Sequence, residues 1–226
     1  MKDEARFTRG GTRQTISMSV VAMRMVWRAV ALAIAVLAVC GVSAAATFRV
    51  ATEQTNVAFS VSNFGIGTHE GRFDLTWGKI TLDAERHSGS IDFVVDVGSV
   101  NTGWELRDTF LKSDLMFDVQ RYPSIRFHST RLDFDGSRIV AVDGEMTLHG
   151  VTRPVRFDVR KMECGADTGV GSDGCGARVS GRISRSAFGM SFAYPLVGDE
   201  VALDFSIKAV RVPDSYATEP PERVAR

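Results

Sequence analysis

The sequence lacks the short motifs by which several large enzyme classes are recognised. It has no Gly-x-Ser-x-Gly segment, which excludes the strand-to-helix serine elbow of α/β-hydrolases. No glycine-rich loop follows a strand pattern, so a phosphate-binding loop is not indicated. The histidines His69, His87, His128 and His149 show neither His-x-His nor His-x-x-x-His spacing, which leaves a metal site on one element without support. A serine–histidine–acid triad assembled in space stays open.

The chain also lacks a strong excess of charge of one sign. The chain has 27 basic and 27 acidic residues. Six of the basic and two of the acidic residues lie in residues 1–46, so the remainder carries 21 against 25, a net charge of −4. No basic patch with interleaved aromatic residues occurs, and nucleic acid is therefore not an expected partner.

No apolar run reaches the roughly 20 residues that span a bilayer. The run Ala29–Val39 follows two arginines and precedes the small residues Ser43–Ala46, which is the pattern of a secretory signal peptide. We expect residues 1–46 to be a signal peptide with an upstream leader that could reflect a mis-assigned gene start. Cleavage would give a periplasmic or secreted protein. A membrane anchor and a lipoprotein modified at Cys40 are the alternatives.

Cysteine is scarce, and only Cys164 and Cys175 follow residue 46. They flank the glycine-rich segment 165–174. In an exported protein, two cysteines at the ends of one loop indicate a disulfide, and chain entropy gives so short a loop just under about 3 kcal/mol. Two thiols without a nearby histidine or further cysteine do not fill a tetrahedral shell. We expect a structural disulfide and no metal site.

The clearest pattern in the chain is a pair of alternating runs within Ile139–Val159, joined by a turn at His149–Pro154. Successive strand side chains point to opposite faces, so this hairpin has one polar and one apolar face. The predicted apolar face comprises Val140, Val142, Gly144, Met146, Leu148, Val155, Phe157 and Val159. Further strands or a ligand must cover it.

Similar alternation recurs often enough to predict at least eight strands. The other alternating segments are 57–61, 73–77, 91–95, 125–128, 179–183 and 201–208. One segment breaks this period, because Leu111 and Leu115 are four residues apart and predict a short helix over about 109–118. Without βαβ spacing, the fold is all-β, either a sandwich or a closed barrel. The polar tail 213–226 is expected to be disordered.

Phenylalanine is the one abundant aromatic residue beyond position 46. Its inward strand positions are Phe59, Phe73, Phe93, Phe127, Phe157 and Phe205. Such residues either fill a barrel or line a cavity within it, and the pattern alone leaves both open.

Several short blocks follow one another in a specific order between Phe48 and Arg211. They are Val57–Val61, Gly71–Phe73, Ser99–Thr102, Arg107–Asp108, Leu111–Asp114, Phe117–Asp118, Tyr122–Thr130, Gly144–Val155, Phe188–Gly189 and Val197–Val201. This ordered set resembles the YceI family of exported polyisoprenoid-binding proteins. One departure is Phe110, where the family usually has a histidine after the Arg-Asp pair, and a less polar head group would suit that change.

The resemblance implies an eight-stranded antiparallel lipocalin-like barrel with one short helix, spanning residues 47–212. Its interior would form an apolar tunnel that holds an isoprenoid or another amphiphilic lipid, such as a prenyl lipid or a quinone tail. The implied role is binding and not catalysis, with no cofactor other than such a bound lipid or quinone. Transient membrane contact and a monomeric or homodimeric state agree with this role.

Candidate ligand contacts follow from the inward phases and the resemblance together. The expected wall residues are Phe59, Val61, Phe73, Phe93, Phe127, Met146, Phe157 and Phe205. The expected rim residues are Leu111, Leu115, Phe188 and Phe192, with Arg107 near the head group. Two alternatives remain at this point: an envelope stress protein with a packed barrel and protein partners, and a lipid or ester hydrolase that uses His69 or His149.

Overall fold

The computed structural model describes residues 45–63 and 67–213. Nearly all of the predicted signal peptide and of the predicted disordered tail lie outside these residues. In the part of the chain that is described, no helix is long and apolar enough to cross a membrane.

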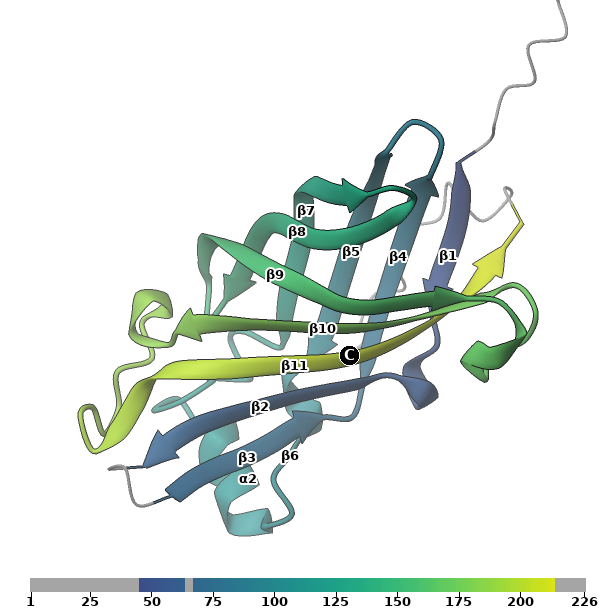
Figure 1. Ribbon diagram of the computed structural model, residues 1–226. Coiled ribbons are helices and arrows are strands. Elements are labelled where there is room, and N and C mark those ends of the chain that lie inside the picture. Colours follow the sequence, from purple (N-terminus) through teal and green to yellow (C-terminus); the bar gives the residue numbers. More distant parts are fainter. Residues whose placement is uncertain (1–44, 64–66, 214–226) are drawn as a thin grey trace, which may run out of the picture. The chain divides into compact units, whose positions relative to one another are not determined.

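The described chain consists mainly of strands (Figure 1). The strands are β1 Ala46–Val50, β2 Asn56–Asn63, β3 Gly67–Phe73, β4 Thr76–Asp83, β5 Ser88–Asp96, β6 Val100–Asn101, β7 Ser124–Asp135, β8 Arg138–Leu148, β9 Val151–Cys164, β10 Gly174–Ser184 and β11 Val197–Val212. The helical segments are α2 Glu105–Lys112 and the 3₁₀ turns η1 Thr52–Gln54, η2 Val97–Ser99, η3 Ala166–Thr168 and η4 Ser186–Phe188.

These strands close into an eight-stranded antiparallel barrel. The ring runs β1-β4-β5-β7-β8-β9-β10-β11, and β1 pairs with β11 to complete it. The three remaining strands continue ring strands past a local break: β2 continues β1 after η1, β3 precedes β4, and β6 continues β5 after η2. Closure removes the open edges that a sandwich would keep. The barrel prediction is confirmed.

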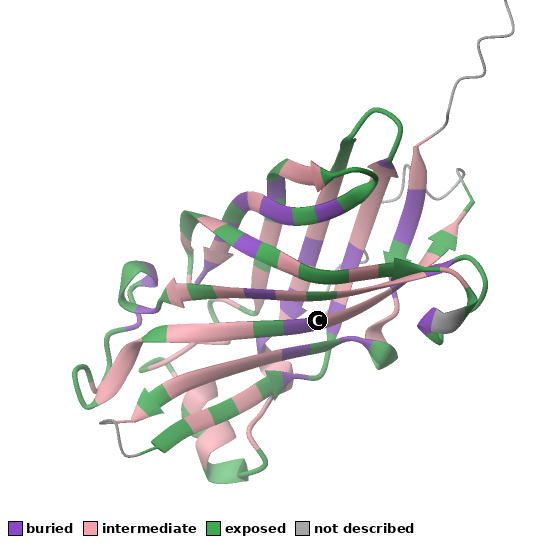
Figure 2. Ribbon diagram, viewed as in Figure 1, coloured by how far each residue is buried: buried purple, intermediate pink, exposed green. Residues whose placement is uncertain are grey.

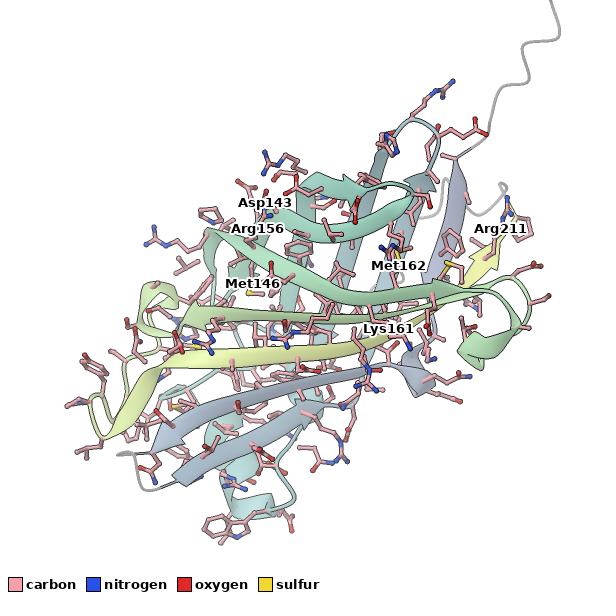
Figure 3. All side chains as sticks on the ribbon, in the orientation of Figure 1. Asp143, Met146, Arg156, Lys161, Met162 and Arg211 are labelled. Carbon is pink, nitrogen blue, oxygen red and sulfur yellow. A yellow bond between two sulfur atoms is a disulfide. The ribbon has the colours of Figure 1, made fainter. Side chains whose placement is uncertain are left out.

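The central hairpin has the predicted polar and apolar faces over most of its length. Met146 and Phe157 are buried, whereas Asp143 of β8 and Arg156 of β9 form an ion pair on the outer face, with Nη1 and Oδ2 2.9 Å apart (Figure 3). Hydrogen bonds from Arg156 hold the pKa of the Asp143 carboxyl below its usual value.

Two details of this hairpin were predicted wrongly. The turn is only His149–Gly150, both with positive φ (51° and 74°), as a two-residue hairpin turn of this hand requires. Val140 is not on the apolar face, because Ala141 pairs with Asp133 and Ile139 with Phe134. Val140 is thus the extra residue of a β-bulge, and its side chain is 39% exposed.

The helix prediction was right in kind and wrong in its bounds. Helix α2 spans Glu105–Lys112, and Ser113 ends it with an extended backbone while its hydroxyl donates to the carbonyl of Phe110 (2.7 Å). The segment that follows forms turns, in which the amide of Asp118 donates to the carbonyl of Ser113 (2.8 Å). Consequently the predicted rim residue Leu115 does not share a helical face with Leu111.

The two ends of the barrel are built differently (Figures 1 and 2). One end, here called the packed end, holds the turns β4–β5 and β7–β8 and the β9–β10 loop. Cys164 and Cys175 form the predicted disulfide at the base of that loop. Its buried apolar residues are Phe48, Val50, Ile139, Ala141 and Ala209. The opposite end, here called the mouth, holds α2, the β8–β9 turn and the segment between η4 and β11.

Candidate ligand-binding cavity

The barrel contains a partly open cavity of about 320 Å³ on the mouth side of its interior. This volume lies at the lower limit of the usual range of small-molecule sites. Every predicted contact except Leu115 and Phe188 lines it; these are Phe59, Val61, Phe73, Phe93, Arg107, Leu111, Phe127, Met146, Phe157, Phe192 and Phe205. The packed-barrel alternative requires an interior that is filled by its own side chains. The cavity shows that this interior is not filled.

The two exceptions have different surroundings. Leu115 is 55% exposed, because it follows the end of α2. Phe188 is only 2% exposed and belongs to the same buried apolar cluster as Phe157 and Met190, but it does not itself line the cavity. These two residues do not line the cavity, and the ligand-contacting role of all the predicted residues stays a prediction.

The barrel stays hollow despite its phenylalanines because several rings lie over glycines of the neighbouring strand. The directly paired residues are Phe59–Gly71, Phe93–Gly78 and Phe157–Gly181. A Cβ atom added to Gly71 or Gly181 would lie 2.4 Å from a carbon of the facing ring. Since real Cβ atoms do not approach so closely, only glycine lets these rings rest against the wall.

Ring-to-ring contacts support the same arrangement. Phe157 contacts Phe127 and Phe205 edge to face, with both centroid distances 5.3 Å, and Phe205 contacts Phe93 at 6.5 Å. Edge-to-face pairs of this kind contribute about 0.5–1.5 kcal/mol each beyond burial. The rings thus form a continuous apolar wall suited to an alkyl or prenyl chain.

A polar cluster lies where the cavity meets the mouth. Arg107 donates from Nε to the hydroxyl of Thr102 (2.8 Å) and from Nη2 to its carbonyl (2.9 Å). Its Nη1 lies 3.2 Å from Nδ1 of His69, which must accept because a guanidinium has no acceptor. Asp108 fixes Thr102 by accepting from its amide (2.8 Å) and its hydroxyl (2.6 Å). Arg107 is thereby held in a fixed orientation at the edge of the cavity.

Arg185 is a charged lining residue that sequence reasoning missed. It is only 5% exposed, and its guanidinium donates to four backbone carbonyls. These acceptors are Met190 (2.7 Å), Phe192 (2.8 Å), Val197 (2.8 Å) and Gly198 (2.8 Å). Arginine is mostly exposed and is rarely buried without a partner. Because nothing in the local sequence around Arg185 indicates such partners, its burial could not be predicted.

Asp199 completes this part of the mouth. It accepts from the Ser184 hydroxyl and from the Ser186 amide (2.8 Å). The hydrogen bond from Ser184, with smaller contributions from Ser186 and the charge of Arg185, holds the pKa of Asp199 below its usual value. The lowered pKa favours the ionised carboxylate. This carboxylate holds the first residue of η4, Ser186, through the hydrogen bond from its amide.

The histidines do not form a catalytic constellation. His69 lies between Arg107 and the side-chain amide of Asn63, whose nitrogen is 3.1 Å from Nε2. His149 packs on Tyr122 with ring centroids 4.8 Å apart. Throughout residues 45–63 and 67–213, no histidine forms a hydrogen bond with a serine, and no three potential ligands gather around a metal position. The hydrolase alternative gains no support from this geometry.

A second hollow of about 940 Å³ lies over the outer faces of β2, β3, β9, β10 and β11. It is larger than the central cavity, but many of its lining residues are polar or charged. Its charged residues are Glu70, Arg72, Arg156, Asp158, Arg160, Arg182 and Asp204. Such a lining does not suit an apolar chain, and the central cavity is the better candidate for a lipid.

Known proteins resemble this chain in sequence and in fold. A model of the YceI-like domain matches residues 48–209. A UPF0312 protein of Vibrio campbellii is 28% identical over 154 residues, which cover 67% of this chain and 78% of the relative. The crystal structure of BcnA from Burkholderia cenocepacia matches with a TM-score of 0.59 at 22% identity, over 71% of this chain and 99% of that one. A polyisoprenoid binding domain from Saccharophagus degradans matches with a TM-score of 0.55 at 17% identity, over 73% and 98%.

Proposed function

The chain belongs to the family of YceI-like domains, and from this membership we propose that it binds one long apolar or amphiphilic lipid inside its barrel. A polyisoprenoid or a quinone tail is the ligand class that fits. The observation that carries the proposal is the partly open cavity of about 320 Å³ with its phenylalanine-rich wall. The domain from Saccharophagus degradans that shares this fold is described as polyisoprenoid-binding, which supports the same class.

The energetics of an apolar tail agree with reversible binding. Burial contributes about 0.8 kcal/mol per CH₂ group, so ten buried carbons give roughly 8 kcal/mol before any cost. Ordering a flexible tail and losing its freedom of motion offset part of this gain. We expect a dissociation constant in the micromolar range and a role in carrying or holding lipid, with no chemical step.

The mouth would receive the polar head of the ligand. Arg107 is held by Thr102 and His69 and lines the cavity, so it can donate to a head-group oxygen. Phe110 also lines this region, and it offers an apolar ring where the YceI family usually has a histidine. This combination favours a small or weakly polar head, such as an alcohol or a quinone.

Export belongs to the same proposal. The run Ala29–Val39 with its flanking residues predicts a cleaved signal peptide, and the Cys164–Cys175 disulfide suits an oxidising compartment. Cell fractionation with amino-terminal sequencing tests this part, because the exported chain should begin near residue 47. An uncleaved chain in the cytosol would contradict it.

Native mass spectrometry followed by organic extraction tests the binding function. Protein purified without detergent should carry one lipid per chain, or should take up one molecule of an added 20-carbon prenyl alcohol. Protein that arrives empty and takes up no prenyl probe would overturn the proposal.

A further inference from the structure

Large apolar side chains are exposed mainly around the mouth. Nine such residues are exposed in the part of the chain that is described, and six of them belong to two segments there. The six residues, here called the rim patch, are Trp104, Leu106 and Phe110 at α2, and Phe192, Tyr194 and Leu196 between η4 and β11. Soluble proteins rarely gather exposed apolar residues in this way unless the surface binds a partner or a membrane.

The rim patch is one surface, and it is continuous with the lipid cavity. The rings of Phe110 and Phe192 touch across the two segments, with centroids 5.2 Å apart. Both residues are more than a third exposed, and both also line the cavity. Apolar surface therefore runs without a break from the cavity wall to the outside of the molecule.

The segment Gly189–Leu196 has the chemistry of a membrane-inserting loop. It contains no charged residue. Its exposed residues include Tyr194 (60%), and the neighbouring segment adds Trp104 (57%); rings of both types favour the boundary between water and lipid.

Several backbone carbonyls of this segment are also hydrogen-bonded within the protein. A polar backbone group placed in lipid is costly unless it is bonded within the protein. The guanidinium of Arg185 donates hydrogen bonds to the carbonyls of Met190 and Phe192 in this segment. It also donates to the carbonyls of Val197 and Gly198, which follow the segment. The carbonyls of Ser191 and Ala193 are bonded within the segment region, by the amides of Tyr194 (3.1 Å) and Val197 (2.9 Å).

We propose that the rim patch docks onto the surface of a lipid bilayer, so that a lipid tail passes between membrane and cavity without crossing water. This inference rests on the proposed lipid-binding function and adds that the bilayer is the source of the bound lipid. Docking is expected to be reversible, since a few partly buried side chains give a peripheral attachment.

Vesicle flotation with the full chain tests the docking. The probes are phosphatidylcholine vesicles with and without an anionic lipid. The double variant Leu106→Ser/Tyr194→Ser removes two exposed side chains that do not line the cavity. We expect its vesicle binding to fall about tenfold or more, whereas Val140→Ser, which alters an exposed apolar residue on the barrel wall, should leave binding unchanged. If the double variant does not fold, Leu106→Ser alone serves, because that side chain is 71% exposed.

The rate of transfer supplies a second measure. A fluorescent prenyl probe should move from vesicles into the double variant more slowly than into the natural chain, while the affinity at equilibrium stays the same. Equal vesicle binding by the double variant and the natural chain would overturn the proposal. So would a dimer that the double variant abolishes without any vesicle binding, because the rim patch would then join two copies of this chain.

The same preparations separate this proposal from the proposed function. Lipid-loaded protein that ignores vesicles would contradict docking alone. Protein that binds vesicles through the rim patch but never holds a lipid would contradict the cavity as the binding site and leave docking in place.

Discussion

The packed end and the mouth of this barrel use the same strands for opposite purposes. At the packed end, Phe48, Val50 and Ile139 are buried and line no cavity, and short turns and a disulfide close the barrel. At the mouth, phenylalanine rings rest on glycines and leave a void, and one buried arginine organises the covering segment. One end of the barrel therefore supplies stability, and the other end supplies space.

The largest expected effect compares one substitution at both ends. Phe48→Ala should lower the free energy of unfolding by about 3–5 kcal/mol, because it removes a buried ring and leaves a new cavity. Phe59→Ala should cost only about 2 kcal/mol, since this ring already borders the void and mainly its transfer from water is lost. Urea unfolding of both variants measures the difference. Equal losses would mean that the mouth is as tightly packed as the other end.

Removing the disulfide isolates the packed end. The double variant Cys164→Ala/Cys175→Ala frees a loop whose ends are 11 residues apart, and it should lower the free energy of unfolding by just under about 3 kcal/mol. Uptake of a prenyl probe should not change, because neither cysteine lines the cavity. Loss of uptake in a folded variant would show that the two ends are not independent.

A third substitution acts on the wall of the cavity. In Gly181→Ala, the new methyl group would lie 2.4 Å from the ring of Phe157 and would push that ring toward the lumen. Such overpacking costs about 1–3 kcal/mol, and prenyl uptake should weaken as well. Gly67→Ala is the matched control, since no atom lies within 4 Å of its added Cβ. Equal uptake by both variants would contradict the role of the phenylalanine–glycine pairs.

The smallest expected effect is a pH dependence at the mouth. The lowered pKa of Asp199 means that its charge stabilises the fold above the unfolded-state pKa of about 3.9, and that this contribution is lost as the pH falls through the lower folded-state pKa. The difference in stability between the natural chain and Asp199→Asn should therefore shrink below about pH 4. Urea midpoints from pH 2.5 to 7 give the comparison, and a difference that stays constant over this range would count against it.

Most of the fold was predictable, because burial with period two is a local property of the sequence. The alternation around Met146 and Phe157 indicated their inward position, and the ordered motif blocks indicated a barrel over a sandwich. The bulge at Val140 was not predictable in this way. It depends on how β7 and β8 pair, which neither strand shows by itself.

The candidate site was predictable in its wall and less so in its mouth. Inward phenylalanines suggested either a filled or a hollow interior, and only the pairing of Phe157 with Gly181 across two strands explains why it is hollow. Arg185 acts on carbonyls 5 to 13 residues further along the chain, so its role needs the folded course of that segment. Leu115 was predicted to share a helical face with Leu111, but Ser113 ends α2 before it and Leu115 does not line the cavity.

One binding measurement tests the central claim, that the void at the mouth side holds a lipid tail. Val179 lines the cavity, so a tryptophan at this position should fill the void. Val140 is exposed at the β-bulge, so a tryptophan there should leave the void unchanged. The affinity of a fluorescent 20-carbon prenyl probe is measured for the natural chain, Val179→Trp and Val140→Trp, all with folding checked by circular dichroism. We expect micromolar binding by the natural chain and by Val140→Trp, and binding at least about 100-fold weaker by Val179→Trp, because several buried CH₂ groups of the probe would lose their place in the cavity. Equal affinity for all three proteins would contradict this claim.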